Sequence, residues 1–86
     1  MYSVVLSQRA DKFLKKVETQ VSQRIKDKLQ TLKNNPIPSD SKFITRENNE
    51  KIFRIRIGDY RALYKVKDKE RIVLVAKIDK RPHIYK

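Results

Sequence analysis

Three arginines lie close together in the second half of the chain, and their spacing is suited to binding phosphate groups. Gly58-Asp59 separates Arg54 and Arg56 from Arg61 and is typical of a two-residue hairpin turn with glycine first. In that hairpin Arg56 faces Arg61, and Arg54 shares their face because alternate side chains of a strand point the same way. Like charges directly opposite one another destabilise a sheet. We therefore expect the face to bind a polyanion, which the planar fork of arginine suits.

A solvated strand face is the alternative, in which the arginines only deter aggregation at a sheet edge. The charge of the chain favours binding. Its 86 residues hold 22 Lys and Arg against 10 Asp and Glu, a net charge of +12. Residues 51–86 alone hold 12 basic and 4 acidic side chains. Such a surplus attracts polyanions.

The end of the chain offers further candidates. Arg81, His83 and Tyr85 stand at alternate positions, so an extended tail points all three side chains to one side. Histidine titrates near neutral pH, as acid–base catalysis requires, although a lone surface histidine usually has no such role. Tyr85 would stack on a nucleotide base or fix the chain end to the sheet. Glu47 or Glu50 would supply a carboxylate base, or would be solvated loop charges.

Composition excludes several kinds of chemistry. The chain has no cysteine, and therefore no thiolate nucleophile, disulfide or cysteine metal site. One histidine disfavours a transition-metal site, and one glycine is too few for a phosphate-binding loop. No apolar run approaches the roughly 18 residues of a membrane span, and no signal peptide precedes the first strand. We expect a cytoplasmic protein with no membrane partner, metal or other cofactor.

The spacing of apolar residues predicts the elements that hold these side chains. Alternation predicts the strand pair that carries the arginines, and an apolar run from Ile72 to Ala76 predicts a central strand. Helical spacing earlier in the chain predicts two helices, with Ser7 capping the first and Asn34-Asn35-Pro36 ending the second. The expected elements are a strand at 2–6, helical stripes at 10–17 and 21–32, a short strand at 42–45, strands at 52–57, 60–66 and 72–76, and a tail from Asp79.

Together these elements predict one α+β domain over residues 1–86. Its order is β-α-α-β-β-β, or β-α-α-(β)-β-β-β with the short strand at 42–45 included. A helical hairpin covers one face of a mostly antiparallel sheet of four or five strands. Phe53, Ile55 and Ile57 should point toward the helices, and Tyr60 and Tyr64 should share that face. The arginines should then lie on the opposite face.

The segment from Phe53 to Tyr64 resembles the central signature of the RelE/ParE toxin superfamily. The closing Lys80-Arg81-Pro82-His83-Ile84-Tyr85 is similar to the family's end, where an arginine leaves the last strand and a tyrosine follows four residues later. The helix start at residues 7–14 and the break at 34–36 also fit. The resemblance covers the whole chain, and the block around the arginines is its most specific part.

The resemblance implies the toxin of a type II toxin–antitoxin pair, with an acidic antitoxin as partner. Toxins of the RelE branch cleave mRNA in the ribosomal A site without a metal, and the RNA's own 2′-hydroxyl attacks the adjacent phosphate. Lys80 would contact RNA beside this site. The family's catalytic positions fall here on Arg54, Arg56, Arg61, Arg81 and Tyr85.

The chain departs from the family pattern in ways that leave part of the mechanism open. RelE often has lysines at the positions of Arg54 and Arg56, and arginine is a poor general base because it stays protonated. Many relatives have a histidine where Lys80 stands, whereas His83 follows Arg81 by two residues. Two other functions on the same fold stay open: a ParE-type inhibitor of DNA gyrase, and a non-catalytic RNA- or ribosome-binding module.

Overall fold

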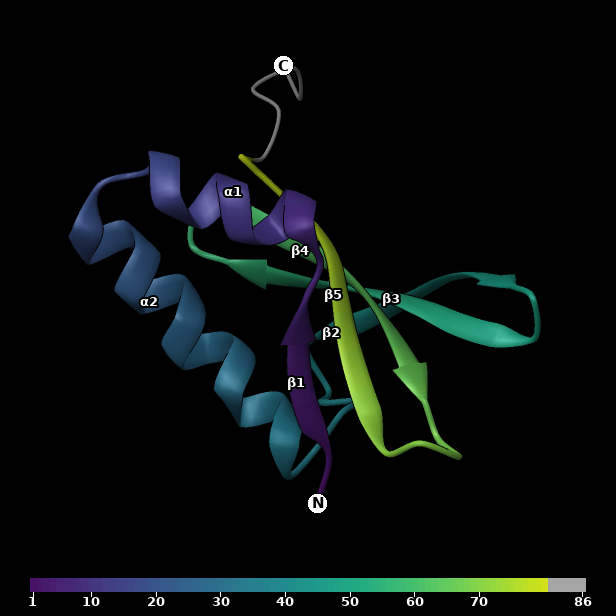
Figure 1. The fold of residues 1–86 in the computed structure, drawn as a ribbon. Helices are drawn as coiled ribbons and strands as arrows, with labels where there is room; N and C mark the ends of the chain where they lie inside the picture. The colour runs from purple at the N-terminus through teal and green to yellow at the C-terminus, as the bar shows by residue number, and fades with distance from the viewer. Residues whose placement is uncertain (81–86) are drawn as a thin grey trace, which may run out of the picture.

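The computed structural model describes residues 1–80 of the protein (Figure 1). Its elements are β1 (Ser3–Leu6), α1 (Gln8–Lys16), α2 (Thr19–Gln30), the 3₁₀ helix η1 (Thr31–Lys33), β2 (Ser41–Glu47), β3 (Glu50–Ile57), β4 (Tyr60–Lys67) and β5 (Ile72–Lys80).

The five strands form one sheet in the order β1-β5-β4-β3-β2. The pair β1–β5 is parallel and the other three pairs are antiparallel, so the predicted, mostly antiparallel sheet is confirmed. Both helices lie on one face of the sheet (Figure 1). The expected α+β architecture is therefore correct, and we call the sheet face away from the helices the open face.

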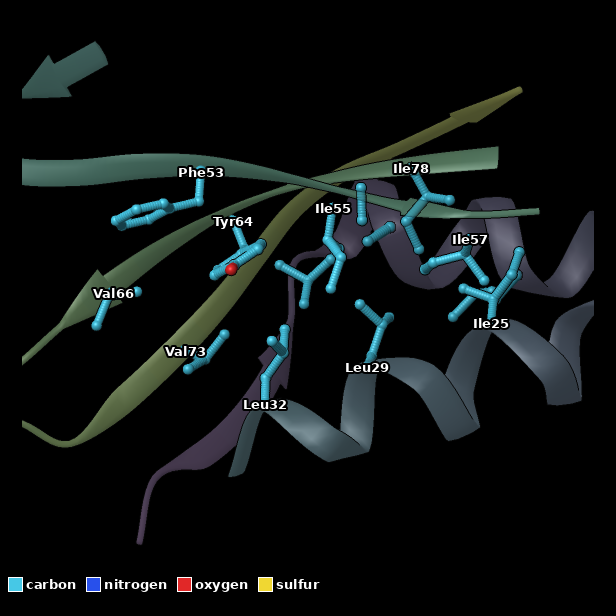
Figure 2. Packing of buried hydrophobic residues seen from close by; sticks show 14 residues of the cluster. Ile25, Leu29, Leu32, Phe53, Ile55, Ile57, Tyr64, Val66, Val73 and Ile78 are labelled. Carbon is cyan, nitrogen blue, oxygen red and sulfur yellow. The ribbon is translucent and has the colours of Figure 1, made fainter. Parts of the chain in front are cut away.

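The hydrophobic core lies between the helices and the sheet (Figure 2). Phe53, Ile55 and Ile57 of β3 are 5%, 0% and 5% exposed, as their alternation predicts. From α2, Ile25 and Leu29 pack against them from the other side. Burial of one strand face fixes the direction of every other side chain in β3 and β4.

Two tight turns set the register of the central hairpins. Gly58 begins the β3–β4 turn with φ +59°, which confirms the glycine-first turn. A side chain there would be strained, and its Cβ would lie 3.2 Å from Nη1 of Arg24 on α2. Asn48 and Asn49 join β2 to β3 with φ of 52° and 66°, and asparagine tolerates this left-handed backbone.

Two strands, β2 and β5, exceed their predicted ranges most, whereas β3 and β4 are longer by only one or two residues. β5 continues through Asp79 and Lys80, where a tail was expected, because Arg61 and Tyr60 of β4 pair with them. The expected strand at residues 42–45 is the middle of β2, which spans Ser41–Glu47 along the edge of the sheet. In both places backbone pairing extends a strand through polar residues that carry no apolar pattern.

A buried tyrosine ties the loop before β2 to the sheet. Tyr64 is 0% exposed, and its ring stacks on Phe53 with centroids 5.7 Å apart. Its hydroxyl donates a 2.8 Å hydrogen bond to the carbonyl of Pro36. Burial raises the pKa of the Tyr64 hydroxyl; a hydrogen bond with Ser41 opposes this in part, and the charge of Asp40 adds to the rise.

Tyr64→Phe should lower the free energy of unfolding by about 1 kcal/mol at neutral pH, because the Pro36 carbonyl loses its donor. Tyr60→Phe is the matched control and should change it by less than about 0.5 kcal/mol, because Tyr60 packs through its ring, 5.9 Å from that of Phe13. Denaturant unfolding measures both. Equal destabilisation of the two variants would contradict a stabilising hydrogen bond from Tyr64 to Pro36.

The raised pKa of Tyr64 predicts that the contribution of its hydroxyl to stability depends on pH. A raised pKa in the folded state favours the neutral hydroxyl, so its stabilisation is complete below the unfolded pKa of about 10. That stabilisation is lost as the pH rises through the higher folded pKa. The difference in stability between wild type and Tyr64→Phe should therefore shrink above about pH 10, and a difference that grew there would refute the sign of the shift.

Candidate functional site

The β3–β4 hairpin has the register that the sequence predicts. Arg56 pairs with Arg61, and Arg54 lies two residues before Arg56 on the same side of β3. Arg54 and Arg61 are half-buried, whereas Arg56 is exposed. All three project from the open face, because the intervening residues of both strands are in the core.

Pairing with the outer strands enlarges this basic surface. Arg54 pairs with Lys42 of β2 and with Leu63 of β4, and Leu63 in turn pairs with Lys77 of β5. Residues that pair directly across strands share a face. We call the resulting set the cationic face: Lys42, Arg54, Arg56, Arg61 and Lys77.

One carboxylate joins the cationic face. Asp79 pairs with Arg61 across β4 and β5, and its Oδ2 lies 3.2 Å from Nζ of Lys77. Within residues 1–80, none of Arg54, Arg56 and Arg61 forms a salt bridge. Among residues 1–80, strand pairing thus places one carboxylate beside the two opposed guanidinium groups, and it is bonded to Lys77, which favours binding of an anionic ligand.

Lys42, Lys77 and Asp79 were missed from the sequence. Their places on the open face follow from strand register, and β2 and β5 each contain an irregularity that apolar alternation does not reveal. The pairing of Arg56 with Arg61 was visible from the sequence because the two-residue turn Gly58-Asp59 fixes the register locally.

Other predicted site residues are placed differently or lie outside the described part. Lys80 pairs with Tyr60, whose ring packs on Phe13 of α1, so Lys80 belongs to the helix-covered side of the sheet and not to the cationic face. Arg81, His83 and Tyr85 fall in residues 81–86, outside the described residues.

The glutamates suggested as a base lie at the wrong end of the sheet. Glu50 precedes Arg56 by six strand residues, or about 20 Å. Its Oε2 lies 3.2 Å from Nζ of Lys67, and Oε1 of Glu47 lies 3.0 Å from Nζ of Lys65. Neither carboxylate can reach a phosphate held at Arg56.

Residues 1–80 contain neither a metal-binding cluster nor a membrane-spanning helix. This part of the chain has no group of three or more His, Asp or Glu side chains arranged to hold a metal ion. It also has no helix that is long and apolar enough to cross a membrane.

Comparison with known proteins decides the family. The family model described as “ParE toxin of type II toxin-antitoxin system, parDE” matches residues 4–85. A curated protein of Methanocaldococcus jannaschii named “Putative toxin RelE1” is 34% identical over 86 residues, which cover 99% of this chain and 96% of the relative. The chain belongs to the RelE/ParE toxin superfamily. The resemblance noted from the arginine hairpin is thereby confirmed.

Solved RelE structures share the fold of this superfamily member. The RelE–RelB complex of Pyrococcus horikoshii matches with a TM-score of 0.84 and 24% identity, over 95% of this chain and 97% of the other. The isolated RelE toxin of E. coli matches with a TM-score of 0.77 and 24% identity, over 99% and 89% of the two chains. The RelBE2 complex of Mycobacterium tuberculosis matches at 0.78 and 25%, over 93% and 98%.

Removal of the carboxylate from the cationic face should strengthen polyanion binding. Asp79→Asn should tighten the binding of fluorescent polyphosphate about 2- to 5-fold at low salt, which corresponds to one Coulomb interaction at the surface. Glu70→Gln is the control with the same charge change, because it lies in the β4–β5 turn at the other end of β5. Anisotropy titrations at two salt concentrations measure both. An equal gain in the two variants would show that only net charge matters.

Proposed function

We propose that this toxin is a metal-independent endoribonuclease that cleaves mRNA on the ribosome and so inhibits translation. The observation that carries the proposal is the cationic face. Arg56 and Arg61 are directly opposed on a rigid strand pair, beside Arg54 and without salt bridges among residues 1–80. A phosphate group would offset the repulsion between them.

The proposed reaction uses the RNA's own nucleophile. The 2′-oxygen attacks the adjacent phosphorus as its proton leaves, and the bond from phosphorus to the 5′-oxygen breaks. The products are a 2′,3′-cyclic phosphate and a 5′-hydroxyl that takes up a proton. The pentacovalent transition state carries extra negative charge, which donors fixed in advance stabilise by several kcal/mol. Arginine supplies such donors without any change of protonation.

The residue roles follow from this chemistry. Arg54, Arg56 and Arg61 would hold the reacting phosphate and stabilise its charge. From the part of the chain beyond residue 80, Arg81 would bind the same phosphate and Tyr85 would stack on a nucleotide. His83 would transfer a proton. Lys80 would contact the RNA backbone from the end of β5, outside the cationic face.

The ribosome is proposed as the device that positions the substrate. The cationic face consists of side chains on one sheet surface, which bind phosphates but read no base sequence. Cleavage also requires the 2′-oxygen to lie in line with the bond that breaks. An mRNA held by the ribosome can meet that requirement, and such positioning accounts for large rate effects.

The proposed protein partner is an acidic antitoxin of the RelB type. The structural neighbours from P. horikoshii and M. tuberculosis are toxin–antitoxin complexes, and a chain with net charge +12 attracts an acidic partner. A partner that covers the cationic face would block RNA binding. Because ribosomes are the proposed target, the toxin would act in the cytoplasm.

A ParE-type action on DNA gyrase is the second candidate. It is favoured by the description of the matching family model, which names parDE. Such a toxin has no need of a cluster of arginines arranged around a phosphate. The cationic face therefore favours RNA cleavage.

Arg61→Ala should slow cleavage by about 10²- to 10³-fold, the usual loss when one charge-stabilising donor is removed. Arg81→Ala should have a similar effect. Stability should change by less than about 0.5 kcal/mol, because the Arg61 guanidinium projects from the open face. Cleavage of mRNA on programmed ribosomes and growth arrest on induction are the measurements.

Arg46→Ala is the control, because Arg46 pairs with Lys51 near the β2–β3 turn, at the other end of the sheet. It should cleave at the wild-type rate. Full toxicity of Arg61→Ala would eliminate the mechanism. A wild-type protein that blocked gyrase supercoiling and left mRNA intact would support the ParE alternative, and ribosome binding without cleavage would support a binding module.

His83→Gln tests the proton transfer. If His83 acts as an acid or base, the wild-type pH–rate profile should inflect near pH 6–7, the ordinary range for histidine, and the variant should lose this inflection. The variant should also cleave about 10²-fold more slowly. Wild-type rates at every pH would make His83 a bystander, and the reaction would then depend on the arginines and on positioning alone.

A further inference from the structure

Strand β5 contains one residue that has no partner on β4. Val75 pairs with Tyr64 and Lys77 pairs with Leu63, so two steps along β5 correspond to one step along β4. Ala76 is the extra residue. An insertion of this kind is a β-bulge, which bends the strand and changes the direction of the side chains that follow.

The bulge decides which side chains of β5 reach the open face. Val73 and Val75 point into the core, and strict alternation from them would also send residues 77 and 79 into the core. With the extra residue, Ile78 is buried instead, at 2% exposure. Lys77 and Asp79 then lie on the open face, where Asp79 pairs with Arg61.

A single residue at the start of α1 holds this bulge. The backbone N–H of Ser7 donates to the carbonyl of Val75 at 2.9 Å, and its hydroxyl donates to the carbonyl of Ala76 at 2.8 Å. Two successive carbonyls of the bulge are thus bonded to Ser7. The same hydroxyl oxygen accepts a 3.1 Å hydrogen bond from the N–H of Ala10 and so caps α1.

These contacts give Ser7 a role that its helix cap alone does not explain. A side-chain cap needs only an acceptor, which aspartate also provides, and glycine is tolerated at this position at little cost. The bond to Ala76 needs a donor, which a hydroxyl provides while it accepts from Ala10. The half-buried side chain therefore joins the start of α1 to the irregular part of β5.

We infer that Ser7 is a positioning residue for the cationic face. Its hydroxyl holds Ala76 in the bulge, and the bulge keeps Lys77 and Asp79 on the side of Arg61. Ser7 itself does not lie on that face and acts only through β5. The inference rests on the proposed function for its cleavage readout, and its structural part can be tested independently.

Three substitutions separate the two hydrogen bonds of the Ser7 hydroxyl. Ser7→Asp keeps an acceptor for Ala10 but cannot donate to Ala76 when ionised. Ser7→Gly also removes the donor, adds no charge and costs little as a cap. Ser7→Thr keeps both bonds. Tyr2→Phe is the matched control, because it removes a hydroxyl that donates to Asp68 at the other end of β1, at 2.7 Å.

Backbone amide chemical shifts, thermal unfolding and the rate of mRNA cleavage are measured on all four variants. Ser7→Asp and Ser7→Gly should shift the amides of residues 76–79 and reduce kcat about 10- to 100-fold, as expected when charged groups beside the reacting phosphate are slightly displaced. Ser7→Asp should unfold near the wild-type temperature, because aspartate caps as well as serine does. Ser7→Thr should keep the wild-type amide shifts and the wild-type cleavage rate. Tyr2→Phe should leave the amide shifts of residues 76–79 and the cleavage rate unchanged.

Wild-type amide shifts for residues 76–79 in both Ser7→Asp and Ser7→Gly would overturn the inference, because the hydroxyl would then not hold the bulge. Shifted amides with wild-type cleavage would overturn the positioning role. A wild-type protein that cleaves no mRNA would refute the proposed function, and the amide shifts would still decide whether Ser7 holds β5.

Discussion

The structure depends on one constraint, which is that β3 and β4 bury one face and expose the other. Phe53, Ile55 and Ile57 fill the space under α2, so the arginines between them must point away. A slip of one residue would exchange the two sets. It would place two guanidinium groups in an apolar core, at a cost far above the stability of a small domain. The register that packs the core therefore also sets the direction of the arginines.

The two ends of the open face differ in how their charges are balanced. Near the β2–β3 turn, Lys65 and Lys67 are paired with Glu47 and Glu50. Near the β3–β4 turn, strand pairing within residues 1–80 places a single carboxylate, that of Asp79, beside the cationic face. The lysines at the first end are neutralised by the protein's own carboxylates, whereas the arginines at the second end would be stabilised by a bound anion. This contrast supports the proposed position of the phosphate site near the β3–β4 turn.

The sequence predicted what local rules determine and missed what depends on distant pairing. Gly58-Asp59 fixed the opposition of Arg56 and Arg61, and Ser7 was recognised as a helix cap, because turns and caps involve near neighbours. The bulge at Ala76 was not predictable, since the run from Ile72 to Ala76 is apolar on both faces and shows no phase. Lys77 and Asp79 were missed for that reason. Lys42 was missed because β2 lies at an edge, where exposed residues show no alternation.

The central claim is that the RNA supplies its own nucleophile while fixed arginines stabilise the charge that develops. It is tested most directly with programmed ribosomes that carry an mRNA with a single 2′-deoxy nucleotide on the 5′ side of the bond that is cut. The account predicts that the toxin cleaves the all-ribose mRNA to a 2′,3′-cyclic phosphate and leaves the bond after the deoxy nucleotide intact. Cleavage of the deoxy-substituted mRNA at that bond would contradict it.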